Sequence, residues 1–295
     1  MTISRRPDET LRIAVPGGDV RAYRYGKGEG VVLGVSGGPG LPCDYLREPH
    51  AKLAELGFAC AFYDPLGCGA SDKPEDASLW TMARSVAELE AVRKALGLTR
   101  VHLLGQSWGA VLSIEYALTY PEAVATLTLA NGAADIPHLV SELLRLREAL
   151  GPETVAMMQR HEAEGTFEHP EYEAAITILY RRHICRTFDW PEPLNASFAA
   201  INLAIYKTMW GASEYCVTGN LRDWSRLADL HRLTMPTLIL VGLHDELTPA
   251  CSRLIHERVS NSHIVVFGNS SHMPFYEEPE AYFGVVMGFL EKHWG

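Results

Sequence analysis

Short apolar runs recur along the first 130 residues, and segments with apolar side chains at helical spacing follow them. The runs expected to form buried strands lie at 31–35, 58–63, 101–105 and 124–130. The helical segments lie at 44–56, 79–96 and about 107–119. Two further strands, 10–15 and 20–25, flank a Pro-Gly-Gly-Asp turn cluster and predict a hairpin. Buried strands alternating with helices are typical of an α/β fold, in which helices cover both faces of a mostly parallel sheet.

This alternation stops between residues 133 and 232, where no convincing buried strand is found. The segment 138–150 is amphipathic, and Pro152 and Pro170 are each expected to begin a further helix. Strands then return at 237–242 and 263–267, with helices at 249–259 and about 279–292. We therefore expect one sheet domain, formed by 1–132 and 233–295, with an all-helical domain at 133–232 inserted between two of its strands.

The composition narrows the class of protein. Hydrophobic residues make up 47% and charged residues 21% of the 295 residues, which is typical of a globular protein. Acidic residues outnumber basic ones by 36 to 26, and the net charge of −10 disfavours nucleic acid or an anionic membrane as a partner. No apolar stretch approaches the roughly 20 residues of a membrane span, and no apolar leader follows the start. The six cysteines form no C-x-x-C pair, so we expect reduced thiols in a cytoplasmic protein and no zinc site.

The most specific chemical signal is Gly105-Gln106-Ser107-Trp108-Gly109, a G-x-S-x-G pattern between a predicted strand and a predicted helix. This context is the one that a nucleophile elbow requires. Such a turn lifts the serine hydroxyl above the sheet, and the N–H of the next residue then faces a developing oxyanion. The alternative is a plain glycine-serine loop at the end of a strand.

A serine nucleophile needs a base, and this fold predicts the chain order serine, acid, histidine. Asp245 follows the strand 237–242, and His272 follows the strand 263–267. Both positions lie at the carboxyl ends of strands, where open α/β sheets gather their sites. His244 and Glu246 are neighbouring competitors, and Asp245 could instead begin a helix. We predict Ser107, Asp245 and His272 as a catalytic triad.

The glycine-rich segment 36–40 (Ser-Gly-Gly-Pro-Gly) follows the third predicted strand. Its backbone can approach a ligand closely and can supply the second donor of an oxyanion hole. A phosphate-binding loop would end in Gly-Lys-Ser/Thr, whereas Leu41 and Pro42 follow here. A glycine turn without a catalytic role is the remaining alternative.

The chain resembles the prolyl iminopeptidases, the serine aminopeptidases of the α/β-hydrolase fold, and especially their tricorn-interacting type. The matching stretches run along nearly the whole chain: SGGPG (36–40), YDPLGCGASD (63–72), GQSWGA (105–110), HPEY (169–172), DWPE (189–192), GASEYCVTGNLRDW (211–224), VGLHDELTP (241–249) and SSHMPFYEEPE (270–280). The resemblance implies the same triad, an oxyanion hole formed by the N–H groups of Gly38 and Trp108, and a cap domain formed by the insertion.

The resemblance also implies a clamp for the free amino group of a substrate. Glu214, in the insertion, and Glu246, directly after the predicted catalytic acid, align with the acidic residues of that clamp. Gly37, Trp210 and Tyr215 are expected to contact the substrate as well. The four aromatic residues Trp108, Trp210, Tyr215 and Phe275 are candidates for the walls of an apolar pocket, and a place in the core is the alternative for each of them.

Two positions depart from the family pattern. Ser36 stands where the family usually has histidine, and Pro65-Leu66 stand where it often has Gln-Arg. Neither change removes a triad member, but both bear on a strict preference for proline, since relatives with this scaffold hydrolyse amino-acid amides, esters or lactones.

The predicted function is that of a serine hydrolase that needs no metal or organic cofactor. It would cleave an N-terminal proline or another apolar residue from short peptides or amino-acyl amides through an acyl-enzyme. The alternatives are an amino-acid amidase, a small-molecule esterase or lactonase, and a non-catalytic binding protein with the same fold. The sequence does not indicate an oligomeric state.

Overall fold

The computed structural model describes residues 5–28 and 30–294 and contains a central eight-stranded sheet. Its strands, in spatial order, are β1 (Glu9–Val15), β2 (Gly18–Tyr25), β4 (Ala59–Asp64), β3 (Val31–Val35), β5 (Val101–Gln106), β6 (Val124–Ala130), β9 (Thr237–Gly242) and β10 (Ser262–Phe267). The first two pairs in this order are antiparallel, and every other pair is parallel. The predicted strands and the mostly parallel sheet are therefore confirmed.

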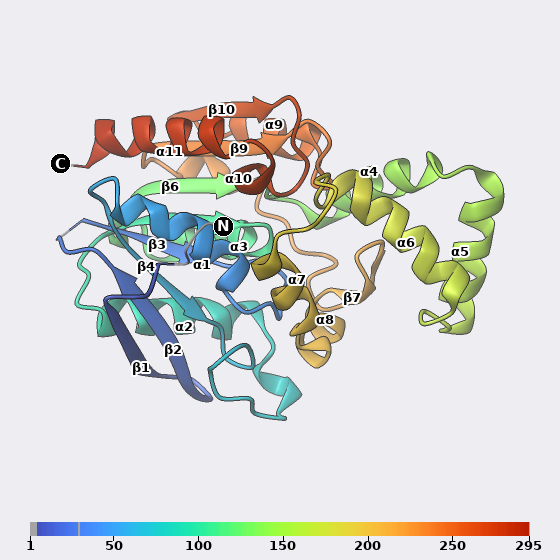
Figure 1. Cartoon of the computed structure of the whole chain (residues 1–295), viewed down its shortest axis with the longest axis horizontal. Helices are drawn as coiled ribbons and strands as arrows, with labels where there is room; N and C mark the ends of the chain where they lie inside the picture. Colours follow the sequence, from blue (N-terminus) through green and yellow to red (C-terminus); the bar gives the residue numbers. More distant parts are fainter. Residues whose placement is uncertain (1–4, 29, 295) are drawn as a thin grey trace.

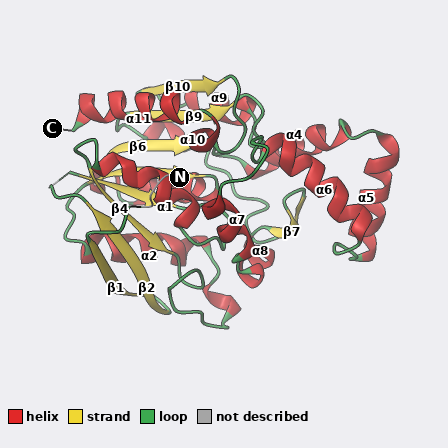
Figure 2. Ribbon diagram, in the orientation of Figure 1, coloured by secondary structure: helices red, strands yellow, loops and turns green. Residues whose placement is uncertain are grey.

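Helices cover both faces of this sheet (Figures 1 and 2). Their bounds are α1 (Asp44–His50), α2 (Met82–Ala95), α3 (Trp108–Thr119), α9 (Pro249–His256), α10 (Pro274–Glu277) and α11 (Pro279–His293). Short 3₁₀ turns occur at Ala51–Ala54, Ala77–Leu79, Pro121–Ala123 and Leu230–Arg232. No helix within the described part of the chain is long and apolar enough to cross a membrane.

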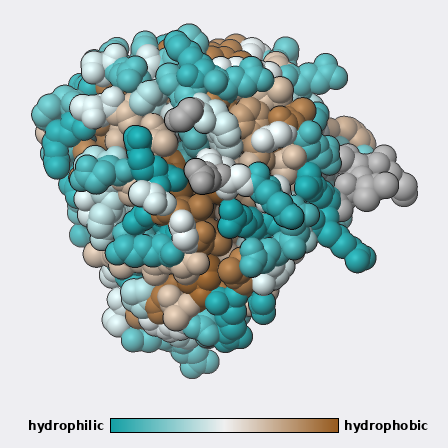
Figure 3. Space-filling model, turned by 90° about the vertical axis from the view of Figure 1, so that its left-hand side faces the viewer, coloured by the Kyte–Doolittle hydropathy of each residue, from teal (hydrophilic) through white to brown (hydrophobic). Residues whose placement is uncertain are grey.

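The sheet separates two apolar cores because successive side chains of a strand point to opposite faces. Leu33 and Leu103 belong to the core that α2, α3 and α9 cover. Val32 and Leu104, one position away, belong to the core that α1 and α11 cover. The face opposite the insertion mixes hydrophilic side chains with a narrow hydrophobic band (Figure 3).

The chain between β6 and β9 projects from one end of the sheet, the end to which the arrows of β6 and β10 point (Figure 1). Its helices are α4 (Ile136–Glu148), α5 (Pro152–Glu164), α6 (Pro170–His183), α7 (Glu192–Ala199) and α8 (Leu203–Met209). One correction to the expected all-helical insertion is needed, because β7 (Gly211–Ser213) and β8 (Cys216–Val217) form a two-stranded antiparallel sheet. The turn between these strands carries Glu214 and Tyr215.

Candidate active site

Ser107 occupies a strained turn between β5 and α3. Its φ of 58° and ψ of −125° are unusual for a residue with a side chain. The flanking glycines are required by space, since a Cβ at Gly105 would lie 2.2 Å from the Gly109 carbonyl oxygen. A Cβ at Gly109 would lie 2.1 Å from the carbonyl oxygen of Val35. The turn therefore has the geometry of the predicted nucleophile elbow, with Ser107 at the N-terminus of α3.

Asp245 and His272 follow the carboxyl ends of β9 and β10 and meet above the sheet. His272 Nδ1 donates to Asp245 Oδ1 at 2.7 Å, and both residues are buried. The same oxygen accepts the N–H of Leu247 at 2.9 Å. Burial alone would lower the pKa of His272, but the charge and hydrogen bond of Asp245 raise it above its ordinary value. The imidazole is therefore held in one orientation and made more basic.

Asn131, which the sequence did not single out, supports this pair from the end of β6. Its Nδ2 donates to Asp245 Oδ2 at 2.6 Å and to the carbonyl oxygen of Ser271 at 3.3 Å. Its φ of 55° is one that asparagine tolerates better than most residues. A polar residue directly after a buried strand is the only local signal for this role.

The glycine-rich loop after β3 is tied to the elbow and to the histidine loop. The N–H of Gly37 donates to the Tyr45 hydroxyl at 2.5 Å, and this hydroxyl donates to Gln106 Oε1 at 2.6 Å. Gln106 Nε2 then donates to the carbonyl oxygen of His272 at 3.2 Å. Gly38, the next residue of the loop, faces the same cavity as Ser107.

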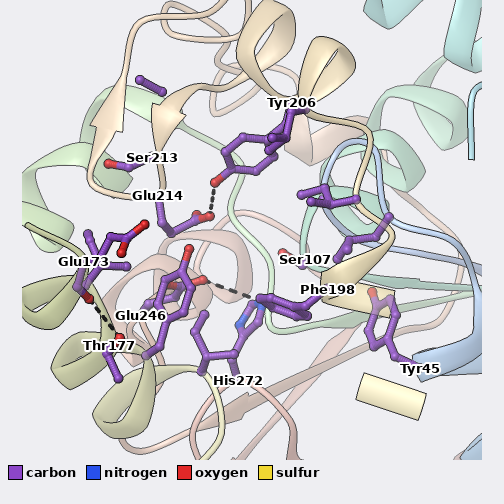
Figure 4. A pocket seen from close by; sticks show the side chains of 18 of the residues that line it. Tyr45, Ser107, Glu173, Thr177, Phe198, Tyr206, Ser213, Glu214, Glu246 and His272 are labelled. Atoms are coloured by element: carbon purple, nitrogen blue, oxygen red, sulfur yellow. Dashed lines mark hydrogen bonds and ion pairs between the residues drawn. The ribbon is translucent and has the colours of Figure 1, made fainter. Parts of the chain in front are cut away.

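A cavity of about 460 Å³ opens above Ser107 and His272. Its apolar lining comes mainly from the inserted segment, which contributes Phe167, Ile176, Tyr180, Ile184, Phe198, Ile201 and Leu203. The size and lining are typical of a small-molecule site, in which a few polar groups fix the orientation of the ligand. Figure 4 shows Ser107, His272, Glu214 and Glu246 around this cavity.

Glu214 and Glu246 place two carboxylates in the cavity beside His272 (Figure 4). Glu214, in the β7–β8 turn, is partly buried and accepts a hydrogen bond from the Tyr206 hydroxyl. Glu246 is buried, and its Oε1 lies 4.0 Å from His272 Nε2. Its Oε2 has no hydrogen-bond partner among the described residues. Burial raises the pKa of both carboxyl groups, and the charges of Glu214 and Asp245 raise that of Glu246 further.

The other predicted substrate contacts lie behind the wall of the cavity. Trp210 and Tyr215 are buried in the core and are not among the residues that line the cavity. Gly37 is likewise absent from the lining, since its N–H faces Tyr45. Trp210 still reaches the site indirectly, because its Nε1 donates to the Glu214 carbonyl oxygen at 3.3 Å. The position of Trp210 and Tyr215 is therefore the one expected of core residues, which was the alternative to a direct contact with the substrate.

Trp108 and Phe275 also pack in the core. Trp108 belongs to the same cluster as α2 and α3, and Phe275 belongs to the cluster beneath α11. Neither side chain lines the cavity. The predicted role of Trp108 concerns its backbone N–H, and the buried side chain fixes that backbone at the start of α3.

One group of potential metal ligands lies in the inserted segment. Ligand atoms of His161, His169 and Glu171 lie within 4.8 Å of one another. However, Nδ1 of His169 accepts the backbone N–H of Glu171, and the two imidazole rings stack with centroids 4.4 Å apart. Arg160 Nη2 lies 3.3 Å from Glu171 Oε2 and 3.4 Å from His161 Nε2. Nδ1 of His169 is thus occupied by a helix cap, and the carboxylate of Glu171 by an ion pair. These potential ligand atoms therefore do not fit a metal ion.

A second group, formed by Cys43, Asp44 and Asp64, lies where β4 ends and α1 begins. The carboxylate of Asp64 accepts hydrogen bonds from the N–H of Cys43, the hydroxyl of Tyr23 and the N–H of Ala70. Burial raises the pKa of the Cys43 thiol well above its ordinary value, which disfavours the thiolate that binds metals. Asp64 is therefore a buried hydrogen-bond acceptor, and this group does not fit a metal ion.

Comparisons with known proteins agree with this architecture. A family model described as the alpha/beta hydrolase fold matches residues 31–279. The proline iminopeptidase of Saccharolobus solfataricus is 37% identical over 274 residues, which cover 92% of this chain and 88% of that protein. The crystal structure of VinJ has a TM-score of 0.93 and 34% identity, covering 97% of this chain and 99% of that one. The proline iminopeptidase structure from Mycobacterium smegmatis has a TM-score of 0.88 and 33% identity, covering 97% and 98%. The chain is therefore a hydrolase of the α/β-hydrolase fold and belongs to the proline iminopeptidase family.

Proposed function

We propose that the protein is a serine aminopeptidase that releases an N-terminal proline, or another apolar residue, from short peptides or amino-acyl amides. The observation that carries this proposal is that one cavity brings Ser107 together with the Asp245–His272 pair and with the carboxylates of Glu214 and Glu246. The names of the relatives support proline as the residue that is removed. The inserted segment would act as a cap, since its helices and loops together contribute most of the residues that line the cavity.

In this reaction the Ser107 hydroxyl attacks the first carbonyl of the substrate. His272 Nε2 takes the hydroxyl proton, and Asp245 stabilises the imidazolium through the hydrogen bond to Nδ1. The N–H groups of Gly38 and Trp108 would bind the developing oxyanion at the N-terminus of α3. The proton then passes from His272 to the leaving amine, and water hydrolyses the acyl-enzyme.

Glu214 and Glu246 would bind the protonated amino end of the substrate. A cation between two carboxylates in a largely apolar cavity forms stronger hydrogen bonds than it would at the surface. Holding the amino end also places the first carbonyl over Ser107, which restricts cleavage to the end of a chain. An interior peptide bond offers no cation to this pair.

The first experiment tests the nucleophile. We expect Ser107→Ala to abolish turnover of proline p-nitroanilide and labelling by a fluorophosphonate probe, while its circular dichroism and melting temperature stay close to wild type. Wild-type turnover in this variant would contradict the mechanism. Wild-type protein that neither labels nor hydrolyses any substrate would instead support a non-catalytic binding protein.

A second experiment tests the amino-end clamp. N-acetylation removes the cation from proline p-nitroanilide, and we expect kcat/KM to fall at least about 100-fold, which corresponds to losing about 3 kcal/mol of charge-assisted binding. Equal turnover of the free and acetylated substrates would contradict the clamp.

The amidase alternative is compatible with the same cavity of about 460 Å³, because an amino-acid amide offers the same amino end and carbonyl as a peptide. A panel of aminoacyl p-nitroanilides, amino-acid amides and esters distinguishes these activities, because they share the acyl-enzyme but differ in the leaving group. We also propose a cytoplasmic location, which the six free thiols support, five of them buried.

A further inference from the structure

Glu214 and Glu246 place two carboxyl groups close together in a cavity that has few compensating positive charges. Among the described residues that line the cavity, none is lysine or arginine, and His272 is the only basic side chain. Glu246 is 2% exposed, and one of its oxygens lacks any hydrogen-bond partner. Two charged carboxylates are costly in such a place unless a cation or a proton compensates them.

We propose that the cluster of Glu214, Glu246 and His272 holds one extra proton in the free enzyme, and that the amino end of the substrate displaces this proton on binding. The inference rests on the proposed function, because it takes the protonated amine as the ligand of the two acids. It assigns a second role to the clamp, in which amino-end recognition itself frees the catalytic base.

The geometry of the cluster lets the proton occupy either of two positions. Glu246 Oε1 lies 4.0 Å from His272 Nε2, the nitrogen that has to accept the Ser107 proton. The proton can reside on Glu246, as a neutral acid, or on His272, as an imidazolium paired with the carboxylates. Groups that are coupled so closely titrate as a unit, so the inference concerns the number of protons in the cluster and not their assignment.

The surrounding titratable groups add no further positive charge on the substrate side. Those around the cluster are Asp245 beside Glu246, Glu277 on α10, Glu173, Tyr172, Tyr180 and His183 on α6, Tyr206 on α8, Tyr45 on α1 and, behind the cavity wall, Tyr215 in the β7–β8 turn. Burial lowers the pKa of His183, which keeps that imidazole neutral at pH 7. Burial and the nearby acids raise the pKa of Glu246 well above its ordinary value, which agrees with a retained proton.

The exchange gives a reason for discrimination in the chemical step. An amino end that enters the cluster brings its own positive charge, so the extra proton is no longer needed and leaves to solvent. Nε2 of His272 is then free to accept the proton of Ser107. A ligand without an amino end leaves the extra proton in place. The base is then blocked in the fraction of enzyme whose proton resides on His272, so turnover is slowed in addition to the weaker binding. By linkage, the affinity for a protonated amine rises with pH over the range in which the cluster loses its proton.

The test counts protons. Binding of proline p-nitroanilide to Ser107→Ala protein is measured by calorimetry at pH 7 in phosphate, imidazole and Tris buffers, whose ionisation enthalpies differ. We expect release of between about half and one proton per amine bound. Adding Glu246→Gln is expected to reduce the release at least threefold, whereas adding Glu164→Gln, an exposed acid on α5, leaves it unchanged.

A binding enthalpy that is the same in all buffers would overturn the inference, and so would an undiminished release with Glu246→Gln. If proline p-nitroanilide does not bind at all, the proposed function fails, and the proton is then sought directly in the free wild-type enzyme. The inference requires at pH 7 either an infrared C=O stretch of a protonated carboxyl that Glu246→Gln removes, or a protonated His272 in histidine NMR. The absence of both would overturn it independently of substrate binding.

Discussion

At the scale of single residues, Tyr45 and Gln106 matter because they join three loops that come from distant parts of the chain. The Tyr45 hydroxyl accepts from Gly37 and donates to Gln106, whose amide donates to the backbone of His272. All of these groups are buried, so a missing partner leaves a buried polar group unpaired at a cost of about 1–3 kcal/mol. The network therefore couples the position of the glycine-rich loop 36–40 to that of His272.

Removing the hydroxyl of Tyr45 tests this coupling. We expect Tyr45→Phe to lower kcat about 10- to 100-fold with a smaller change in KM, because a loop displacement of a fraction of an ångström misaligns the reacting groups. Tyr116→Phe is the matched control, since its hydroxyl is also buried and bonded to Glu90, but lies away from the cavity. Both variants should lose similar stability in urea, and an equal loss of kcat in both would contradict the positioning role.

The residues of the site differ in how far local sequence reveals them. Ser107 could be predicted because glycines on both sides and a strand–helix context constrain one tight turn. Asp245 and His272 could be predicted from their positions after strands. Asn131 and Tyr45 could not, because their roles arise from contacts with residues far along the chain, and no short pattern encodes such contacts.

At the scale of elements, periodicity predicted the central sheet well, because the inner strands β3, β4, β5 and β9 are mainly apolar runs that are buried along their whole length. The β7–β8 hairpin was missed because its strands have only three and two residues and show no alternation of apolar and polar positions. What holds this hairpin is close backbone packing, since a Cβ at Gly211 would lie 2.1 Å from the Cys216 carbonyl oxygen. The element that positions Glu214 thus depends on a glycine.

This dependence leads to a prediction about the hairpin. Gly211→Ala should push β7 away from β8 and displace Glu214, so that kcat/KM for proline p-nitroanilide falls at least about tenfold. Labelling by a fluorophosphonate, which needs Ser107 and His272 but no amino end, should change less than about threefold. Gly284→Ala on α11 is the control, because its backbone is helical, no atom lies within 4 Å of its added Cβ, and the residue is outside the cavity. Equal loss of labelling and turnover would contradict this local effect.

At the scale of the whole molecule, the core beneath α1 and α11 contains a buried histidine that makes stability depend on pH. His50 Nδ1 lies 2.8 Å from the carbonyl oxygen of Leu46, which can only accept, so Nδ1 carries the proton of the neutral imidazole. Nε2 then accepts a hydrogen bond from the Tyr282 hydroxyl at 2.9 Å. Burial lowers the pKa of His50 to about 4, and the pKa of His102 is lowered to about 4 as well. Both imidazoles are therefore neutral in the folded protein at pH 7.

The sign of the effect follows from proton binding. As pH falls from about 6.5 towards 4, His50 becomes protonated in the unfolded chain but stays neutral in the folded protein. Up to about 3 kcal/mol of the free energy of unfolding is therefore lost. Glu246 acts in the opposite direction, since its raised pKa lets the folded state bind a proton more readily than the unfolded chain does. The histidines therefore destabilise the fold on acidification, and Glu246 partly offsets them.

Urea unfolding at several pH values between 7 and 4.5 measures this dependence. His50→Gln keeps a donor and an acceptor but cannot titrate, so we expect lower stability at pH 7 and a shallower loss of stability on acidification. His231→Gln, at an exposed histidine, should retain the wild-type slope. If His50→Gln and wild type lost stability in parallel over this range, His50 would not be the group that couples the folding of this core to pH.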